Sequence, residues 1–486
     1  MNIHFLHIND VHSSLENYMR LGLRLRQLRD RLRQQGEAVW TLDVGDLVDR
    51  ARPESDITLG RINAALMQSL QVDAWVFGNN EGLSLPVEVW STLGSISGAA
   101  ILGTNLRRQS GLALEGMVDT QCFFHEGVRI GMFGLTPPYE LPYRPLGVRP
   151  TEPRVVARET VERLRACGCD LIVCLSHLGL PEDRELAHAV SGIDLILGGH
   201  THHWLESPEY VGSTMICQAG WRAGAFGHVT LRVETHPFRI THREAHLERV
   251  DVHGPLDPAM WATYREWMAE IELSLARPVL NLQTRLVTDF QTEENFSNLL
   301  SDALLDAKPA HIGMMMAGAL VASMLPGPVD MRQFLAACST PTKPVSMDLS
   351  GWEIRAILER GLVPEVQLHV GRGFGFRGAV VGRLAVSGAM VDVDESGTRV
   401  IDVWMNGDRM LDDFVYRVTA CEYLYLAPVF PEFKNGRNVE FGRSLAREIL
   451  IDYVQDEQNV ERAKDKRYRV VTDRSFGSEE NGDEGL

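Results

Sequence analysis

Three histidines follow a double glycine in one short stretch of the chain, Gly198-Gly199-His200-Thr201-His202-His203. The apolar run Ile193-Asp194-Leu195-Ile196-Leu197 before it predicts a buried strand, which places the histidines at the carboxyl end of a strand. Open α/β sheets bind their ligands at that end, and glycines allow a sharp turn and a close approach. A single histidine is more often structural, but imidazoles grouped in this way favour a metal site.

Four further polar blocks follow predicted strands. The strands are predicted at Ile3–Asn9, Ala38–Leu42, Ala74–Phe77 and Leu171–Leu175. The blocks at their ends are His7-Ile8-Asn9-Asp10-Val11-His12, Asp43-Val44-Gly45-Asp46, Gly78-Asn79-Asn80-Glu81 and Ser176-His177-Leu178-Gly179. Asp and Asn cap helices, so turn chemistry explains one such block, but it does not explain five in succession.

Amphipathic helices predicted between these strands position the polar blocks. They are expected at Asn17–Gln35, Thr58–Leu70, Glu152–Ala166 and Glu182–Val190, and a hairpin is expected at Gln121–His125 and Val128–Gly134. Alternation of strands and helices implies parallel pairing. We therefore expect the five strand ends to meet on one side of one sheet.

The bulk composition limits the function classes. A chain of 486 residues is expected to form two or three domains, and 44% hydrophobic residues supply packed cores. The net charge of −17 argues against binding of a nucleic-acid duplex, which needs a cationic face. A small anionic substrate remains compatible with this charge, because bound metal ions reverse the local field.

Cysteine usage and the chain start bear on the compartment. The seven cysteines are odd in number and scattered, which predicts free thiols in a reducing environment. Residues 1–7 enter a strand directly, without the charged and apolar regions of a signal peptide, and no run of 18 apolar residues predicts a membrane span. We expect a cytoplasmic protein with no membrane partner.

The predicted secondary structure divides the chain into two domains. We expect a first domain over residues 1–250, a helical linker over 251–276, a second domain over 277–470 and an acidic disordered tail over 471–486. In the second domain helices are expected at Asn295–Asp306, Trp352–Arg360 and Ser444–Val454, and strands near Arg383–Val393 and Val400–Met405.

The five blocks together carry a family likeness. In order they are His7-x-Asn9-Asp10-x-His12, Gly45-Asp46, Gly78-Asn79-x-Glu81, Ser176-His177-Leu178-Gly179 and Gly198-Gly199-His200-Thr201-His202. Residues 1–235 resemble the calcineurin-like metallophosphoesterases, and the whole chain resembles the two-domain 5′-nucleotidase family. The resemblance implies an α/β protein: a four-layer α/β/β/α metallophosphoesterase sandwich and a second, smaller α+β domain of the 5′-nucleotidase C-terminal type.

The same resemblance implies a set of metal ligands. One ion would be held by Asp10, His12 and His202, a second by Asn79, His177 and His200, and Asp46 would bridge the two. Carboxylate, imidazole and amide ligands suit two divalent ions such as Mn, Zn, Fe or Mg. Two cations about 3.5–4 Å apart can activate a bridging hydroxide for attack on a phosphoryl group.

The chain departs from the family at its expected acid. Asn80 stands where the family usually has a histidine that contacts the phosphoryl group or leaving oxygen, and Leu83 replaces the aspartate that orients that histidine. Asn80 can donate a hydrogen bond to a phosphoryl oxygen, but it cannot act as an acid. We expect weak hydrolysis of nucleoside monophosphates and a smaller loss on anhydrides, cyclic diesters and aryl esters.

The second domain departs as well. Val321 stands in the place of the family's substrate-binding arginine, and Ala427-Pro428-Val429-Phe430 replaces its nucleobase-binding loop. The segment Gly373-Phe374-Gly375-Phe376-Arg377-Gly378 remains, and with Asn79-Asn80-Glu81 it resembles a YunD-like bacterial branch of the family. Phe374 and Phe376 can stack on a base and Arg377 can pair with phosphate, or the segment is a glycine-rich turn with buried aromatics.

The favoured function is a metal-dependent phosphoric ester hydrolase of the 5′-nucleotidase type, acting on a small phosphorylated, nucleotide-related compound. A 2′,3′-cyclic or other phosphodiesterase on the same site is one alternative. A metal- and nucleotide-binding protein with little turnover is another. The oligomeric state stays open.

Overall fold

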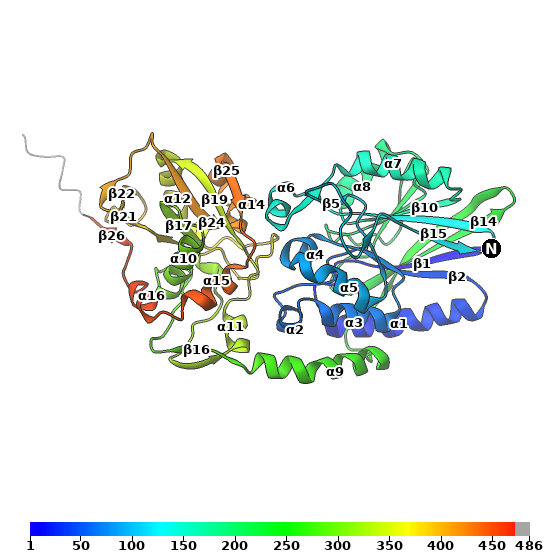
Figure 1. The fold of residues 1–486 in the computed structure, drawn as a ribbon, viewed down its shortest axis with the longest axis horizontal. Coiled ribbons are helices and arrows are strands. Elements are labelled where there is room, and N and C mark those ends of the chain that lie inside the picture. Colours follow the sequence, from blue (N-terminus) through cyan, green and yellow to red (C-terminus); the bar gives the residue numbers. More distant parts are fainter. Residues whose placement is uncertain (472–486) are drawn as a thin grey trace, which may run out of the picture. The chain divides into compact units, whose positions relative to one another are not determined.

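A computed structural model of the chain describes residues 1–471. These form two compact units, the first spanning Met1–Arg277 and the second beginning at Pro278 (Figure 1). The tail predicted at residues 471–486 lies outside the described residues except for its first residue. Within residues 1–471, no helix combines the length and apolar character needed to cross a membrane.

Two sheets form the centre of the first unit. The seven-stranded sheet has the order β15-β14-β1-β2-β3-β4-β6, and the six-stranded sheet has the order β12-β13-β11-β10-β8-β7. The strands of the first are β15 (Phe238–Arg249), β14 (Ala225–Thr235), β1 (Asn2–Ile8), β2 (Ala38–Asp43), β3 (Ala74–Val76), β4 (Ala100–Leu102) and β6 (Met117–Val118). Those of the second are β12 (Glu209–Val211), β13 (Thr214–Gln218), β11 (Leu195–Gly198), β10 (Leu171–Ser176), β8 (Val128–Leu135) and β7 (Thr120–His125).

The cores show four layers. Phe5 and Val76 of one sheet pack in the same buried cluster as Met132 and Leu175 of the other, so the two sheets face each other. On the far side of the six-stranded sheet, α7 (Pro153–Ala166) and α8 (Leu180–Ala189) bury their apolar faces. Helices α1 (Leu15–Gln34), α3 (Arg61–Leu70) and α5 (Trp90–Ser97) lie on the side of the seven-stranded sheet (Figure 1). The predicted α/β/β/α sandwich is confirmed.

The expectation that all five strand ends share one sheet is wrong. Strands β1, β2 and β3 pair in parallel in the seven-stranded sheet, whereas β10 and β11 pair in parallel beside β8 in the other. The hairpin of β7 and β8 begins the second sheet. A strand that is buried on both faces has the same apolar pattern in either sheet, so the pattern cannot assign it to one of them.

Two helices differ from their predictions, one in where it begins and the other in the unit to which it belongs. The helix predicted at Thr58–Leu70 begins at Arg61, after a separate short helix α2 (Pro53–Ile57), because Leu59 and Gly60 take φ values of 49° and 78°. The helix expected as a linker, α9 (Pro258–Leu275), lies in the first unit and packs on α3. Its N-cap Asp257 accepts hydrogen bonds from the Met260 backbone and from Arg26 of α1.

The second unit is a mixed α+β structure. Its five-stranded sheet has the order β20-β17-β24-β19-β25, with strands Leu384–Ser387, Ile312–Met316, Val415–Cys421, Pro344–Ser350 and Arg437–Phe441. A four-stranded sheet follows the order β23-β22-β21-β26, with strands Asp408–Arg409, Val400–Met405, Ala389–Val393 and Tyr468–Val470. The principal helices are α10 (Asn295–Ala307), α12 (Gly351–Leu362) and α15 (Ala446–Tyr453), near their predicted positions. The strand predicted over Arg383–Val393 divides at Gly388, where φ is 73°, and its halves belong to different sheets.

Candidate metal centre

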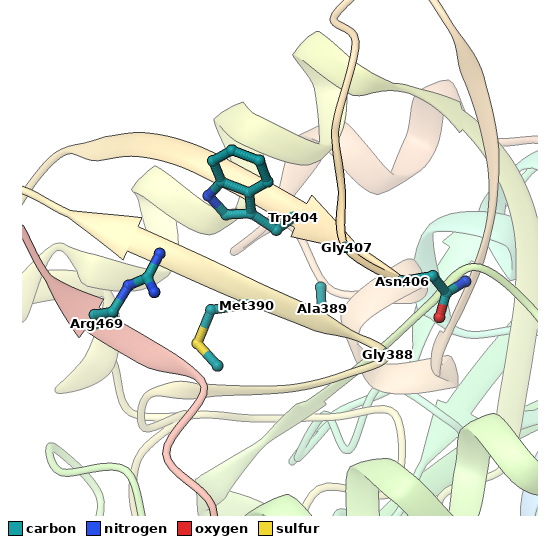
Figure 2. Close-up of a pocket in the computed structure, with 7 residues that line it drawn as sticks. All are labelled: Gly388, Ala389, Met390, Trp404, Asn406, Gly407 and Arg469. Carbon is teal, nitrogen blue, oxygen red and sulfur yellow. The ribbon is translucent and has the colours of Figure 1, made fainter.

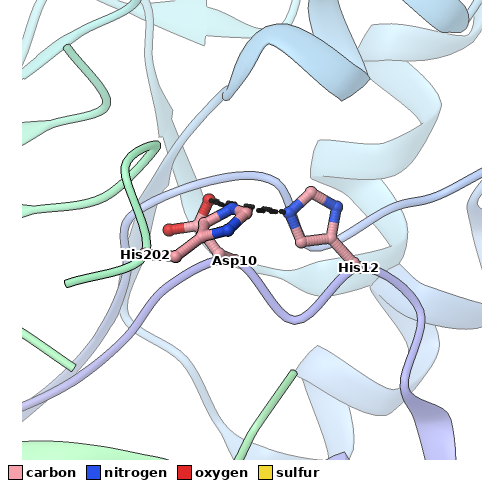
Figure 3. A group of neighbouring side chains, drawn as sticks. All are labelled: Asp10, His12 and His202. Carbon is pink, nitrogen blue, oxygen red and sulfur yellow. Dashed lines mark hydrogen bonds and ion pairs between the residues drawn. The ribbon is translucent and has the colours of Figure 1, made fainter. Parts of the chain in front are cut away.

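The strand ends of the two sheets bring two groups of ligand-type side chains together. Asp10, His12 and His202 form one group, with ligand atoms all within 4.8 Å of one another. Figure 3 shows these three side chains converging. Asp46, His177 and His200 form the second group within the same limit. The structure therefore gathers six of the seven predicted metal ligands, from loops after β1, β2, β10 and β11.

The backbone of these loops is held in an uncommon conformation. Asp10, His12, Asp46, His200 and His202 all have positive φ values, between 47° and 71°. Residues with side chains rarely take this conformation, and when they do the surrounding structure must hold them there, most often at functional sites.

Two glycines make room for the ligands. A Cβ atom on Gly78 would lie 2.1 Å from Asp46 Oδ1, and one on Gly199 would lie 2.9 Å from His177 Nδ1. Neither position can carry a larger residue without displacing a ligand side chain. The glycine of each motif is therefore required by close approach to the site rather than by its own turn.

Asp46 lies between the two groups. Its Oδ2 is 3.8 Å from His12 Nε2, and its Oδ1 is 3.4 Å from His177 Nε2. Asp10 Oδ1 lies 3.3 Å from His202 Nε2 and 3.9 Å from His177 Nε2. Atoms that share a small cation at about 2.0–2.2 Å lie roughly 3–3.5 Å apart, so these spacings fit ligand shells with modest adjustment.

Two buried polar atoms point to a missing partner. His177 Nδ1 donates to the Val44 carbonyl at 2.6 Å, so Nε2 is the ring nitrogen left to face the site. His177 is fully buried, and its Nε2 has no hydrogen-bond partner. The side-chain oxygen of Asn79 is also buried and without a partner. Buried polar atoms are rarely left unsatisfied, and a metal ion accepts electron pairs from both of these.

The pKa values of the site residues also indicate that the site attracts positive charge. Burial opposes protonation of His177, but the carboxylates of Asp46 and Asp10 outweigh it and raise its pKa to about 10. Burial favours the neutral forms of Asp10 and Asp46, yet the neighbouring histidines hold both pKa values below their ordinary value. Burial lowers the pKa of His200 to about 4. The two buried carboxylates therefore attract positive charge, which the proton of His177 supplies here and which a bound metal ion would supply in its place.

Asn80 lies beside the two groups, but its amide is engaged by the protein. Its Nδ2 donates to the Val48 carbonyl at 3.0 Å and lies 3.1 Å from His12 Nδ1. Its backbone N–H donates to Asp46 Oδ1 at 2.8 Å. Asn80 thus holds the Asp46 and His12 loops together, and hydrogen bonding to a phosphoryl oxygen would require its amide to turn.

Three supporting residues were not assigned from the sequence. Glu81 is fully buried and accepts hydrogen bonds from the backbone of Asp46, Val48 and Gly78 at 2.7–3.0 Å. Asp49 Oδ2 lies 3.9 Å from His12 Nδ1, and the Tyr139 hydroxyl lies 3.2 Å from His200 Nε2. The second acid of Gly45-Asp46-x-x-Asp49 was a signal for Asp49, and Tyr139 follows a further parallel strand, β8.

In the second unit, Phe374, Phe376 and Arg377 are adjacent in sequence but have different surroundings. Phe376 is buried and packs on Tyr423 with ring centroids 4.8 Å apart. Phe374 is 45% exposed at a φ of 48°. Arg377 Nη1 donates to the Phe376 carbonyl at 2.9 Å. A Cβ on Gly378 would lie 2.0 Å from the Gly318 carbonyl, so this glycine permits close backbone packing.

A separate hollow lies on the four-stranded sheet of the second unit (Figure 2). It has a volume of about 430 Å³ and is lined by Gly388, Ala389, Met390, Trp404, Asn406, Gly407 and Arg469. Asp392 accepts hydrogen bonds from Arg469 and from the Trp404 indole. None of the predicted site residues lines this hollow.

Comparison with known proteins agrees with this architecture. Residues 3–204 match the calcineurin-like phosphoesterase family, and residues 278–428 match the 5′-nucleotidase C-terminal domain. The chain is 28% identical to the uncharacterized metallophosphoesterase YunD of Bacillus subtilis (strain 168), over 90% of this chain and 95% of that protein. It is also 28% identical to snake venom 5′-nucleotidase of Crotalus adamanteus, over 43% of this chain and 37% of that protein.

A solved structure shows the same fold. NAD nucleotidase (NadN) of Haemophilus influenzae aligns over 97% of this chain and 99% of its own, with a TM-score of 0.68 and 14% identity. The two domain matches identify the chain as a phosphoric ester hydrolase. Residues 3–204 thus form a domain of the calcineurin-like phosphoesterase type, and residues 278–428 a domain of the 5′-nucleotidase C-terminal type.

Proposed function

We propose that this protein hydrolyses a small phosphorylated, nucleotide-related substrate at a centre of two divalent metal ions. The observation that carries the proposal is the placement of Asp46, whose two carboxylate oxygens face different groups of ligand-type residues. A carboxylate in this position can bridge two cations. A site for one ion would need neither the second group nor the split orientation.

The residues present fit such a centre. Asp10, His12 and His202 would hold one ion, His177, His200 and Asn79 the other, and Asp46 both. The buried, unpartnered His177 Nε2 and Asn79 Oδ1 are the acceptors that a second ion would satisfy. Nitrogen and oxygen donors without thiolate suit Mn, Zn, Fe or Mg. Bound ions of this kind lower the pKa of water and neutralise phosphoryl oxygens during an in-line displacement.

The protein's own residues favour substrates with good leaving groups. Asn80 cannot donate a proton to an alkoxide, and its amide is hydrogen-bonded to Val48. Leu83 supplies no carboxylate to orient an acid. Phosphoanhydrides and aryl esters release weakly basic leaving groups, and ring strain assists the opening of cyclic diesters, so all three depend less on a protein acid. We therefore propose that these are hydrolysed faster than nucleoside monophosphates.

The names of the relatives support a nucleotide-related substrate. One relative is a 5′-nucleotidase, and the aligned structure is an NAD nucleotidase. A 2′,3′-cyclic or other phosphodiesterase activity is the second candidate, and the absence of an acid at Asn80 is the observation that favours it.

The test is hydrolysis of p-nitrophenyl phosphate and bis-p-nitrophenyl phosphate with Mn²⁺, by the wild type and by Asp46→Asn. We expect turnover by the wild type and its loss in the variant. Two bound ions per chain without Asp46-dependent turnover would instead identify a metal-binding protein. A comparison of AMP, ADP and UDP-glucose then tests leaving-group selectivity, and equal turnover of all three would contradict it.

A further inference from the structure

An exposed tryptophan and arginine lie beside the candidate metal ligand His202. The Trp221 ring stacks on the His202 ring with centroids 5.0 Å apart and planes only 8° from parallel. The Arg222 guanidinium lies over the Trp221 ring, 4.1 Å from its centroid. The His202 side chain is itself 35% exposed, so this edge of the metal centre opens to solvent. Both Trp221 and Arg222 are exposed.

The loop that carries this pair is fixed to the metal centre. The Arg222 backbone N–H donates to the carbonyl of Asp10 at 2.7 Å. Asn9, next to Asp10, donates to the Gly220 carbonyl at 2.6 Å. Arg222 has a φ of 53°, an uncommon conformation that these contacts hold in place. The guanidinium is therefore positioned by the same loop that supplies a metal ligand.

Arg222 has no ion-pair partner in the part of the chain that the structure describes. Among residues 1–471, no carboxylate lies within ion-pair distance of its guanidinium. The nearby loop offers a contrast: Arg249 lies over the Trp204 ring at 4.9 Å, but it pairs with Glu206. One arginine is saturated by a protein carboxylate, whereas the other presents its donors to solvent next to a catalytic centre.

We infer that Arg222 and Trp221 form a binding site for a second anionic group of the substrate, the phosphate that is not transferred. The inference rests on the proposed phosphoesterase function. The phosphate under attack would have its charge met at the Asp46 cluster. Arg222, one aromatic ring away from His202, meets the phosphate joined to it, and a guanidinium binds phosphate oxygens in pairs. The substrate class is thus a phosphoanhydride, such as a nucleoside diphosphate or a nucleotide sugar.

This assignment is consistent with the chemistry at Asn80. In hydrolysis of an anhydride, water forms a bond to the attacked phosphorus and the bridging P–O bond breaks. The departing phosphate takes the electron pair, and the proton of water passes to solvent. No acid is required, but negative charge develops on the departing phosphate. A fixed guanidinium at that point stabilises this charge without proton transfer.

The first experiment measures steady-state kinetics with Mn²⁺ for the wild type, Arg222→Met and the matched control Arg249→Met. ADP carries two phosphates, whereas p-nitrophenyl phosphate carries one. We expect Arg222→Met to lower kcat/KM for ADP by roughly 10- to 100-fold, which is the effect of removing one charged hydrogen-bond partner. For p-nitrophenyl phosphate, kcat/KM should fall by less than about twofold. Arg249→Met should change neither. Equal losses on both substrates, or no loss on ADP, would overturn the inference.

A binding measurement separates this inference from the proposed function. Calorimetric titration of the Mn²⁺-loaded protein with methylenediphosphonate, which cannot be hydrolysed, should give at least about tenfold weaker binding to Arg222→Met than to the wild type. Methylphosphonate should bind the two proteins alike. If the wild type hydrolyses no phosphate ester, the proposed function fails, and the diphosphonate titration alone decides the anion site. Identical diphosphonate binding by both proteins rejects the site even if the wild type is active.

Discussion

Two clusters of buried polar side chains, one in each unit, differ in how completely the protein itself satisfies their hydrogen bonds. At the strand ends of the first unit, His177 Nε2 and Asn79 Oδ1 are buried without a partner. In the second unit, the buried Arg467 donates to Asp302 at 2.8 and 2.7 Å and to the Val386 carbonyl at 2.7 Å. In the first arrangement, polar atoms remain available to bind a ligand. In the second, the protein itself supplies every hydrogen-bond partner named above.

The hollow of the second unit leads to the same distinction. The hollow on the four-stranded sheet is lined by Trp404 and Arg469, residue types that often bind ligands, but both are hydrogen-bonded to Asp392. At the metal centre, by contrast, the buried His177 Nε2 and Asn79 Oδ1 have no hydrogen-bond partner. Unsatisfied chemistry, rather than the size of a cavity, therefore marks the candidate site in this protein.

The strongest test of this comparison removes an unpartnered ligand atom. We expect His177→Gln to lose one metal ion per chain and about 10³-fold in turnover of bis-p-nitrophenyl phosphate, because charge stabilisation at the attacked phosphate is lost. Metal content by mass spectrometry and steady-state kinetics are the measurements. The control is His311→Gln in the second unit, where the ring accepts a hydrogen bond from the Arg417 backbone. Full metal content in His177→Gln would contradict the ligand assignment.

Removing the ion pair of Arg467 and Asp302 should lower the stability of the second unit without changing metal binding in the first. We expect Arg467→Met to destabilise the second unit by about 3 kcal/mol, because the bonds of the buried guanidinium to Asp302 and the Val386 carbonyl are lost. Urea denaturation followed by fluorescence measures this. The more exposed Arg469, paired with Asp392, is the control, and Arg469→Met should destabilise the unit clearly less. Equal effects of the two variants would remove the distinction.

A smaller effect is expected at Glu81, which touches the ligands only through their backbone. Its carboxylate joins the loops of Asp46 and Gly78. Glu81→Gln places an amide N–H among backbone donors, so the loops should separate and Mn²⁺ affinity should fall roughly 10- to 100-fold. Equilibrium titration with Mn²⁺ is the measurement. Unchanged affinity would show that the loops keep their geometry without this carboxylate.

The smallest expected effect is a gain. Asn80→His introduces an imidazole near the site, and AMP hydrolysis should rise about tenfold, short of the 10²–10⁴-fold that a well-oriented acid supplies. The shortfall follows from Leu83, so the double variant with Leu83→Asp should gain more. ADP hydrolysis should change little in either variant. No gain on AMP in the double variant would show that leaving-group protonation does not limit this enzyme.

Much of the site was accessible from the chain alone. The five polar blocks predicted the loops that carry Asp10, Asp46, Asn79, His177 and His200, because a ligand at a strand end needs both a polar residue and a preceding apolar run. The four-layer fold followed from the family resemblance and is confirmed. The assignment of each ligand to its ion stays a prediction, since the structure shows proximity and not coordination.

Other features depended on contacts between distant segments. Apolar periodicity could not divide the strands between two sheets, because strands buried on both faces look alike. Phe374 and Phe376 have the same residue type and nearly the same position, yet one is exposed and the other packs on Tyr423. Arg222 and Arg249 both lie over a tryptophan, and only a third residue, Glu206, distinguishes them.

The chemical types of the ligands and the order in which they occur are properties of the sequence, because each ligand follows directly from its own strand. The ligands come together only when the two sheets face each other and their loops approach. The same packing directs the two Asp46 oxygens toward different ligand groups, and it places Arg222 where, among residues 1–471, no carboxylate pairs with it. Local residue pattern specifies strands and turns, whereas distances across a site depend on the packing of distant elements, such as those of Asp10 and His200, 190 residues apart.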